Sequence, residues 1–240
     1  MDTLLDVQNL WVRFPSRQGV FDAVRGLSFS LGRERLGIVG ESGSGKSMTG
    51  RAILRLIRPP GILNPVTTIG DQIIEACRLH SKENRQEAHK RALEMLEAVS
   101  IRNPERVMRA YPHEMSGGMG QRIMIAMMLI PNPEILIADE PTSALDVSVQ
   151  RQVLDIMDGL VTERGMGLIF ISHDLNLVAD FCDRVLIMYA GRIVEVCQAD
   201  KLHDAQHPYT QGLLNALPRL NQPRPRLDVL QRDPAWSDAP

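Results

Sequence analysis

A glycine-rich segment at residues 40–47 has the composition of a phosphate-binding loop. It reads Gly40-Glu41-Ser42-Gly43-Ser44-Gly45-Lys46-Ser47 and matches the pattern GxxxxGK[ST] at every defined position. In this pattern the glycines let backbone N–H groups turn toward phosphate oxygens at the positive end of a helix. Lys46 would reach the β- and γ-phosphates of ATP, and the Ser47 hydroxyl would ligate Mg²⁺. The alternative is a glycine-rich turn without a ligand, but an apolar run precedes the segment and a helical pattern follows it, as a binding loop requires.

Two adjacent carboxylates follow another apolar run. Ile135-Leu136-Ile137-Ala138 leads directly into Asp139 and Glu140. Open parallel sheets bind their ligands beyond the carboxyl ends of the strands, where the loop at 40–47 would also lie. We therefore expect Asp139 to hold Mg²⁺, usually through water, and Glu140 to polarise an attacking water. Alone, such a pair is more often a solvated strand end or a helix cap, but beside a phosphate-binding loop the catalytic interpretation is favoured.

A third polar segment opens an apolar helical pattern. Ser116, Gly117 and Gly118 stand directly before it. A serine followed by two glycines at a helix N-terminus can bind an anion, because the N–H groups there are free and the helix dipole is positive. Considered alone, the segment is most simply a helix N-cap.

These segments need a scaffold of alternating strands and helices. The runs 36–39, 135–138 and 168–171 are continuous and apolar, as buried parallel strands are. Helical patterns cover 46–57, 82–99, 116–130 and 147–163, an alternating pattern at 4–31 predicts an antiparallel sheet, and 185–196 predicts a hairpin turning at Ala190-Gly191. The alternation indicates an α/β domain with a mostly parallel central sheet.

The composition excludes several classes of protein. The chain has 240 residues, 44% hydrophobic and 23% charged, with a formal net charge of -2, which gives no electrostatic reason to expect nucleic acid as a partner. The longest apolar run, 123–130, is far shorter than the ~18 residues needed to span a bilayer. The cysteines 77, 182 and 197 lie far apart and have no metal-binding spacing, which suits a reducing cytoplasm without structural disulfides.

The order of the motifs resembles that of ABC-type ATPases. The chain has five motifs in the same order as that family. They are the loop at 40–47, the helix start Ser116-Gly117-Gly118, the apolar run into Asp139-Glu140, the segment Ser143-Ala144-Leu145-Asp146, and a strand followed by His173. The resemblance covers about residues 4–220. The resemblance is more specific in three segments, which are similar to the subfamily that powers dipeptide, oligopeptide and nickel importers: 111–119, 144–147 and 207–214.

The resemblance implies a fold, a dimer and a set of partners. The fold would be an α/β P-loop NTPase (RecA-like) core with an N-terminal antiparallel β subdomain and a helical signature subdomain at about 66–130, all within residues 1–217, and a Pro/Arg-rich tail at 218–240. Two such domains would dimerise so that Ser116, Gly117 and Gly118 of one cap the γ-phosphate at the other. Asp146 would belong to the D-loop, and His173 would contact the γ-phosphate. Phe14 is the candidate for stacking on adenine, with Phe21 as the alternative.

As a transport ATPase, the chain would couple ATP hydrolysis to transmembrane permease subunits. It would pair with a second ABC ATPase, homodimeric or heterodimeric, and serve a periplasmic or extracellular solute-binding protein indirectly. It would lie peripherally on the cytoplasmic face of the bacterial inner membrane, with ATP and Mg²⁺ as cofactors and no nucleic acid.

The chain departs from the family pattern after the first helix. The family has further strands and then a Q-loop resembling FQ-(D/E)-P-M-T-S-L-N-P, whereas here Arg58-Pro59-Pro60-Gly61-Ile62 runs directly into Leu63-Asn64-Pro65. The Q-loop glutamine and the preceding strands are therefore absent, and Gln72 lies too far downstream to replace it. Gly120 stands where the subfamily usually has arginine, and no cysteine-rich segment follows, so we expect no iron–sulfur centre.

Two functions compete on these observations. The first is an ATPase subunit of a peptide or nickel importer, supported by Lys46, Asp139, Glu140 and His173. The second is a nucleotide-binding remnant or regulatory subunit with impaired hydrolysis, supported by the absent Q-loop. A soluble ABC protein of DNA repair or translation would need a second ABC unit or long coiled-coil insertions, and the sequence contains neither.

Overall fold

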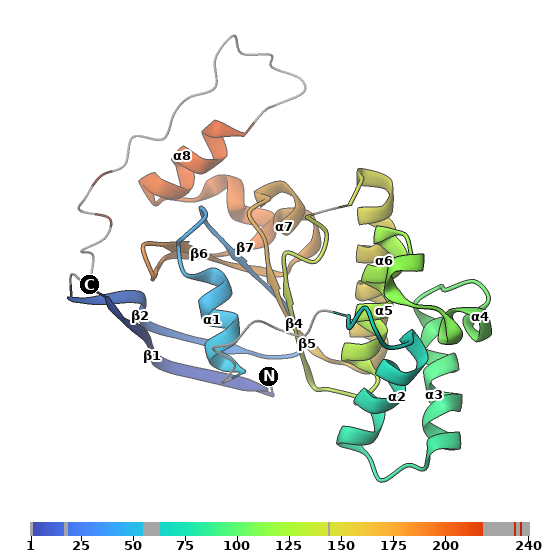
Figure 1. The fold of residues 1–240 in the computed structure, drawn as a ribbon. Helices are drawn as coiled ribbons and strands as arrows, with labels where there is room; N and C mark the ends of the chain where they lie inside the picture. Colours follow the sequence, from blue (N-terminus) through green and yellow to red (C-terminus); the bar gives the residue numbers. More distant parts are fainter. Residues whose placement is uncertain are drawn as a thin grey trace. The chain divides into compact units, whose positions relative to one another are not determined.

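The fold is known from a computed structural model that describes residues 2–16, 19–54, 63–143, 145–217, 233 and 236. The chain forms two compact units, drawn in Figure 1. We call Met1–Pro59, Ile137–Glu140 and Gly167–Pro240 the sheet unit, and Pro60–Leu136 with Pro141–Met166 the helical unit.

A five-stranded sheet forms the centre of the sheet unit, in the order β4-β5-β3-β6-β7. Its strands are β3 (Arg35–Val39), β4 (Ile135–Asp139), β5 (Gly167–Ile171), β6 (Arg184–Tyr189) and β7 (Arg192–Gln198). The central strand β3 is parallel to both β5 and β6, while β6 and β7 form an antiparallel hairpin. Because β5 and β3 are almost wholly buried, their sequences are continuous apolar runs, as expected for strands covered on both faces.

A separate two-stranded sheet consists of β1 (Leu5–Ser16) and β2 (Gly19–Leu31), paired antiparallel. The helices of the sheet unit are α1 (Lys46–Ile53), α7 (Leu175–Phe181), η2 (Ala199–Asp204) and α8 (Pro208–Ala216). Glycine allows α7 to approach β3 closely, because a Cβ on Gly37 would lie 2.3 Å from Val178 Cγ1. The core is thus dense around the strand that leads into the loop at 40–47.

The helical unit contains α2 (Ile69–His80), α3 (Arg85–Ala98), α4 (Pro104–Arg109), η1 (Pro112–Glu114), α5 (Gly117–Leu129) and α6 (Val147–Arg164). Side-chain caps mark several helix starts: Thr68 caps α2, and Asn84 and Glu87 form a capping box at α3. The helix α6 ends at Gly165, whose φ of 59° is the left-handed conformation common after a helix.

The expected elements agree closely with those observed. The three apolar runs are strands, and 116–130 and 147–163 are helices within one residue at each end. The hairpin turns at Ala190 and Gly191, which have φ of 46° and 83°. The helix expected at 46–57 ends at Ile53, and residues 55–62, which contain the departure from the family pattern, lie outside the described residues, as does nearly all of the tail.

Within the described ranges, no helix is both long and apolar enough to cross a bilayer. The three cysteines are free thiols, and burial raises the pKa of Cys182 to about 12.

Candidate functional site

The shape of the loop at 40–47 depends on two glycines, Gly40 and Gly45, where any side chain would be strained. The loop connects β3 to α1, and Gly40 and Gly45 have φ of +152° and +101°. A Cβ on Gly40 would lie 2.2 Å from Met188 O, and one on Gly45 would lie 2.5 Å from Ala23 O. These neighbours are backbone atoms of β6 and β2, which cannot move aside. The loop can pack this closely against both strands because Gly40 and Gly45 have no side chains.

The helix after the loop presents its N-terminus without a side-chain cap. Gly45 occupies the N-cap position of α1 and offers no side chain to the first N–H groups, and the first turn holds no acidic residue. These N–H groups and the positive end of the helix dipole are therefore available to an anion.

Lys46 is buried in this loop and held by its backbone. Only 8% of the residue is exposed, and Nζ donates to Gly40 O at 2.7 Å and to Glu41 O at 2.9 Å. Burial lowers the pKa of Lys46, while the carboxylates of Glu140, Asp139 and Glu41 oppose that shift. The ammonium group therefore lies within the field of both acids expected in the site.

Ser47 and Asp139, both expected as ligands of Mg²⁺, lie in direct contact. The Ser47 hydroxyl donates to Asp139 Oδ1 at 2.9 Å, although 92 residues separate them. A hydroxyl and a carboxylate oxygen side by side are the hard donors that Mg²⁺ prefers, and Mg²⁺ needs few protein ligands when phosphate oxygens complete its shell. The pair fits a nucleotide-bound Mg²⁺, although the described residues include no group of three or more His, Cys, Asp or Glu side chains that could hold a metal alone.

Glu140 and His173 form the second contact of the site. His173 Nδ1 lies 2.9 Å from both carboxylate oxygens of Glu140, and the His173 side chain is exposed. Glu140 has a φ of 51°, unusual for a residue with a side chain, and its N–H donates to Ile171 O at 2.9 Å. A carboxylate and an imidazole in contact, beside the phosphate loop, can position and deprotonate a water.

The structure thus brings together the loop residues 40–47, Asp139, Glu140 and His173. All lie in the sheet unit, at the carboxyl ends of β3, β4 and β5, where open α/β sheets bind their ligands.

The candidates for adenine stacking lie opposite each other in the β1–β2 hairpin. Phe14 pairs with Phe21 across the two strands; Phe14 is half-buried, and Phe21 is 57% exposed. Ala23, whose carbonyl meets the loop at Gly45, lies two residues from Phe21. Trp11, which no sequence motif singles out, is 40% exposed and lies under the guanidinium of Arg13 at 4.4 Å.

In the helical unit, Ser116, Gly117 and Gly118 begin α5. Ser116 is its N-cap, and Oγ accepts from Met119 N–H at 3.4 Å. Ser116 and Gly117 are exposed, whereas a Cβ on Gly118 would meet Val149 Cγ1 of α6 at 2.5 Å. The segment therefore has the capping function that it would have alone, and Ser116 and Gly117 remain exposed at the helix start.

Asp146 begins the next helix. Its carboxylate accepts from the Ser148 hydroxyl at 2.6 Å and from the N–H groups of Ser148 and Val149 at 3.1 and 3.0 Å. The Ser148 hydroxyl, followed by the Val149 N–H, lowers the pKa of Asp146. Its neighbour Ala144 lies outside the described residues.

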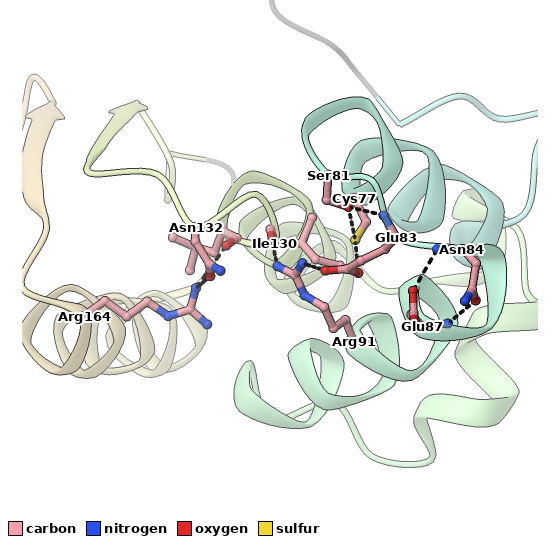
Figure 2. A network of polar contacts seen from close by, with 10 residues as sticks. Cys77, Ser81, Glu83, Asn84, Glu87, Arg91, Ile130, Asn132 and Arg164 are labelled. Carbon is pink, nitrogen blue, oxygen red and sulfur yellow. Dashed lines mark hydrogen bonds and ion pairs between the residues drawn. The ribbon is translucent and has the colours of Figure 1, made fainter.

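Two arginines that the sequence patterns did not reveal hold the far end of α5 (Figure 2). Arg91 of α3 donates to Ile130 O, and Arg164 of α6 donates to Leu129 O at 3.0 Å and to Asn132 Oδ1 at 3.1 Å. Arg91 also pairs with Glu83, which accepts from the Cys77 thiol at 3.2 Å. Cations at the carboxyl end of a helix satisfy its last carbonyls and favour its dipole, so α5 is fixed at the end opposite Ser116.

Another residue outside the sequence predictions is Tyr209 of α8. Its hydroxyl lies 3.0 Å from the Glu41 N–H in the phosphate loop. It belongs to the segment 207–214 that indicated the subfamily, but its contact with residue 41 has no counterpart in the spacing of the sequence.

Comparison with known proteins gives one consistent result. Residues 24–143 match the family of ABC transporters. The chain is 43% identical to the oligopeptide transport ATP-binding protein OppD of Bacillus subtilis, a match that covers 90% of this chain and 72% of OppD. It is 42% identical to the glutathione import ATP-binding protein GsiA of Escherichia coli K12, over 98% of this chain and 45% of GsiA.

Solved structures agree on the fold. A dimeric bacterial ABC transporter cassette, MJ0796, matches with a TM-score of 0.72 and 24% identity over 81% of this chain and 98% of that chain. The same cassette in a post-hydrolysis state with ADP and Pi matches with a TM-score of 0.73, 23% identity and the same coverage.

The alignment with OppD is longer than the part of this chain that it covers. It runs over 259 positions, whereas 90% of 240 residues is about 216, so roughly 40 of its positions have no residue in this chain.

Proposed function

This chain belongs to the ABC transporter ATP-binding family, and from that premise we propose that it is the ATPase subunit of a peptide importer. It is an ABC ATPase, and ATP is its nucleotide. Peptide is the proposed cargo, because OppD is named for oligopeptide transport and GsiA for import of the tripeptide glutathione.

The observation that carries this function is the pair of contacts at the strand ends, Ser47 with Asp139 and Glu140 with His173. The loop N–H groups and Lys46 would hold the β- and γ-phosphates. Mg²⁺, held by Ser47 and Asp139, would neutralise charge on the phosphates. Glu140 would orient the attacking water and accept its proton, and His173 would hold Glu140 and contact the γ-phosphate.

We propose that the working unit is a dimer of ATPase subunits on permease subunits at the cytoplasmic face of the membrane, supplied by a solute-binding protein. The exposed start of α5 supports the dimer, because it is a second anion-binding helix end in a chain whose phosphate loop already provides one. Ser116, Gly117 and Gly118 would then complete the ATP site of the partner subunit. Asp146 would lie at the interface, and Phe14 would stack on adenine, with Phe21 as the alternative.

The test uses the slow-hydrolysis variant Glu140→Gln, which should retain ATP and accumulate as a dimer. Light scattering with ATP and Mg²⁺ measures the oligomer. In that background, Ser116→Asp keeps an N-cap but adds a negative charge where the γ-phosphate should lie, and we expect monomers. Ser116→Asn is the matched control, because asparagine caps equally well and has the same size without the charge.

Dimers in the Asn variant and monomers in the Asp variant would support the composite site. Monomers of the Glu140→Gln protein at every ATP concentration, or dimers in both Ser116 variants, would contradict it.

A further inference from the structure

The phosphate loop has a hydrogen-bond partner from the far end of the described chain. Tyr209 lies in α8, outside the residues 24–143 that match the family model, and the residue is fully buried. Its hydroxyl accepts from the backbone N–H of Glu41 at 3.0 Å, across 168 residues of sequence. A buried hydroxyl that meets a backbone group of the nucleotide loop is in a position to influence how that loop is held.

The contact acts on a specific peptide group, the one that joins Gly40 to Glu41. On one side of it, the Glu41 N–H donates to Tyr209. On the other side, the Gly40 carbonyl accepts from Lys46 Nζ at 2.7 Å. The same amide plane is therefore held by the tyrosine hydroxyl and by the lysine ammonium, and the two bonds polarise each other through it.

Fixing this plane also fixes the groups around it. Gly40 has a φ of +152°, a conformation that favours glycine. Because glycine has no side chain, nothing on Gly40 itself restrains rotation of the adjoining peptide plane. If the plane rotated, the Gly40 carbonyl that accepts from Lys46 would move with it. The position of Lys46 thus depends on a bond that α8 supplies.

The ring of Tyr209 is held independently of its hydroxyl. Its centroid lies 4.6 Å from that of Tyr189 and 5.9 Å from that of Trp236. Its backbone N–H donates to His207 Nδ1 at 3.1 Å, which caps α8. Removing the hydroxyl alone should therefore leave the ring, and the packing of α8, in place.

From this geometry we infer that Tyr209 is a positioning residue of the nucleotide site: its hydroxyl fixes the Gly40–Glu41 peptide and, through it, Lys46. The inference rests on the proposed function, since it assigns a role in nucleotide binding. It gives α8 a part in the ATP site in addition to packing.

The test compares Tyr209→Phe with Tyr189→Phe in the full chain. Both changes remove one hydroxyl from the same aromatic cluster, but Tyr189 has no assigned part in the nucleotide site. We expect Tyr209→Phe to weaken binding of a non-hydrolysable ATP analogue by about three- to tenfold, as measured by calorimetry, because one hydrogen bond to the loop is lost. Tyr189→Phe should bind as the wild type does.

A measurement without nucleotide separates positioning from packing. Hydrogen exchange at the Glu41 amide should be faster in Tyr209→Phe than in the wild type, while exchange within α8 is unchanged. A wild-type chain that fails to bind the analogue would overturn the proposed function. If the wild type binds but Tyr209→Phe matches it in affinity and in Glu41 exchange, only the role of Tyr209 is wrong; faster exchange throughout α8 would likewise assign Tyr209 to packing.

Discussion

The glycines of the phosphate loop and those at the start of α5 are constrained by different neighbours. Gly40 and Gly45 have positive φ, and a Cβ on either would lie within 2.5 Å of a backbone carbonyl oxygen, so nothing around them can yield. Gly118 faces only the side chain of Val149, and the nearest atom to a Cβ on Gly117 is 3.8 Å away. The backbones of neighbouring strands therefore fix the shape of the loop, whereas the α5 start is exposed and capped only by Ser116 of the helical unit.

The largest effect on stability and activity is expected from inserting the Q-loop region of the family, which in sequence would lie between the phosphate loop and the start of α5. Inserting a Q-loop segment of the family, with the strands that precede it, between Ile62 and Leu63 should raise both thermal stability and ATP turnover. The strand β4 is at the edge of the sheet, with Ile135 and Ile137 half-buried. Covering hundreds of Å² of apolar surface at ~25 cal/mol per Å² would stabilise the domain by an amount comparable to its whole ~5–15 kcal/mol.

The control for this insertion is a Gly/Ser segment of equal length at the same place. The measurements are thermal unfolding and phosphate release. If the chain as it stands hydrolyses ATP and drives transport as fast as the version with the inserted segment, the absent segment is not needed.

A smaller effect, confined to nucleotide binding, is expected from Lys46→Ala. Losing a charge-assisted contact to phosphate should weaken ATP binding roughly 10- to 100-fold. Titration with a fluorescent ATP analogue measures this, and Lys82→Ala, which changes an exposed lysine, is the control. Equal ATP affinities of the wild type and Lys46→Ala would show that residues 40–47 are not the phosphate-binding loop.

The contrast between the two glycine sets can be tested directly by Gly45→Ala and Gly117→Ala. Gly45→Ala should lower stability by more than about 2 kcal/mol, because a left-handed alanine is strained and its Cβ would overlap Ala23 O. Gly117→Ala should fold normally, since nothing blocks its Cβ, and should impair only the ATP-dependent dimer. Similar unfolding midpoints in urea for the two variants would abolish the distinction.

The smallest effect concerns Gly120, where the subfamily usually has arginine. No atom lies within 4 Å of a Cβ at this position, and alanine has a higher helix propensity, so Gly120→Ala should stabilise the protein by up to about 1 kcal/mol. Gly118→Ala, two residues earlier, should destabilise it, because its Cβ would meet Val149. Chemical denaturation of both variants gives the signs, and a destabilising Gly120→Ala would show that glycine is required there.

The proximity of the loop and the acidic pair could be predicted, because these motifs lie at strand ends and parallel strands bring their ends to one edge. This explains why Ser47 and Asp139 meet although the chain between them is long. The Tyr209 bond and the arginines at the end of α5 could not be predicted, because they join elements whose packing no local pattern encodes. Helices such as α2 and α7 were missed because they lie between the motifs and carry none of them.

The helix caps at Ser116 and Asp146 bear on which residues a lineage of this protein would keep after it had lost ATP hydrolysis. Folding alone would retain both residues after turnover had ceased, because each begins a helix. Glu140 is different, because its φ of 51° is a conformation in which glycine or asparagine has less strain than glutamate. Without selection for hydrolysis, Glu140 should therefore be replaced before Ser116 or Asp146. In a lineage of this chain, the persistence of glutamate at position 140 would therefore be a better sign of a working ATPase than an intact Ser116 or Asp146.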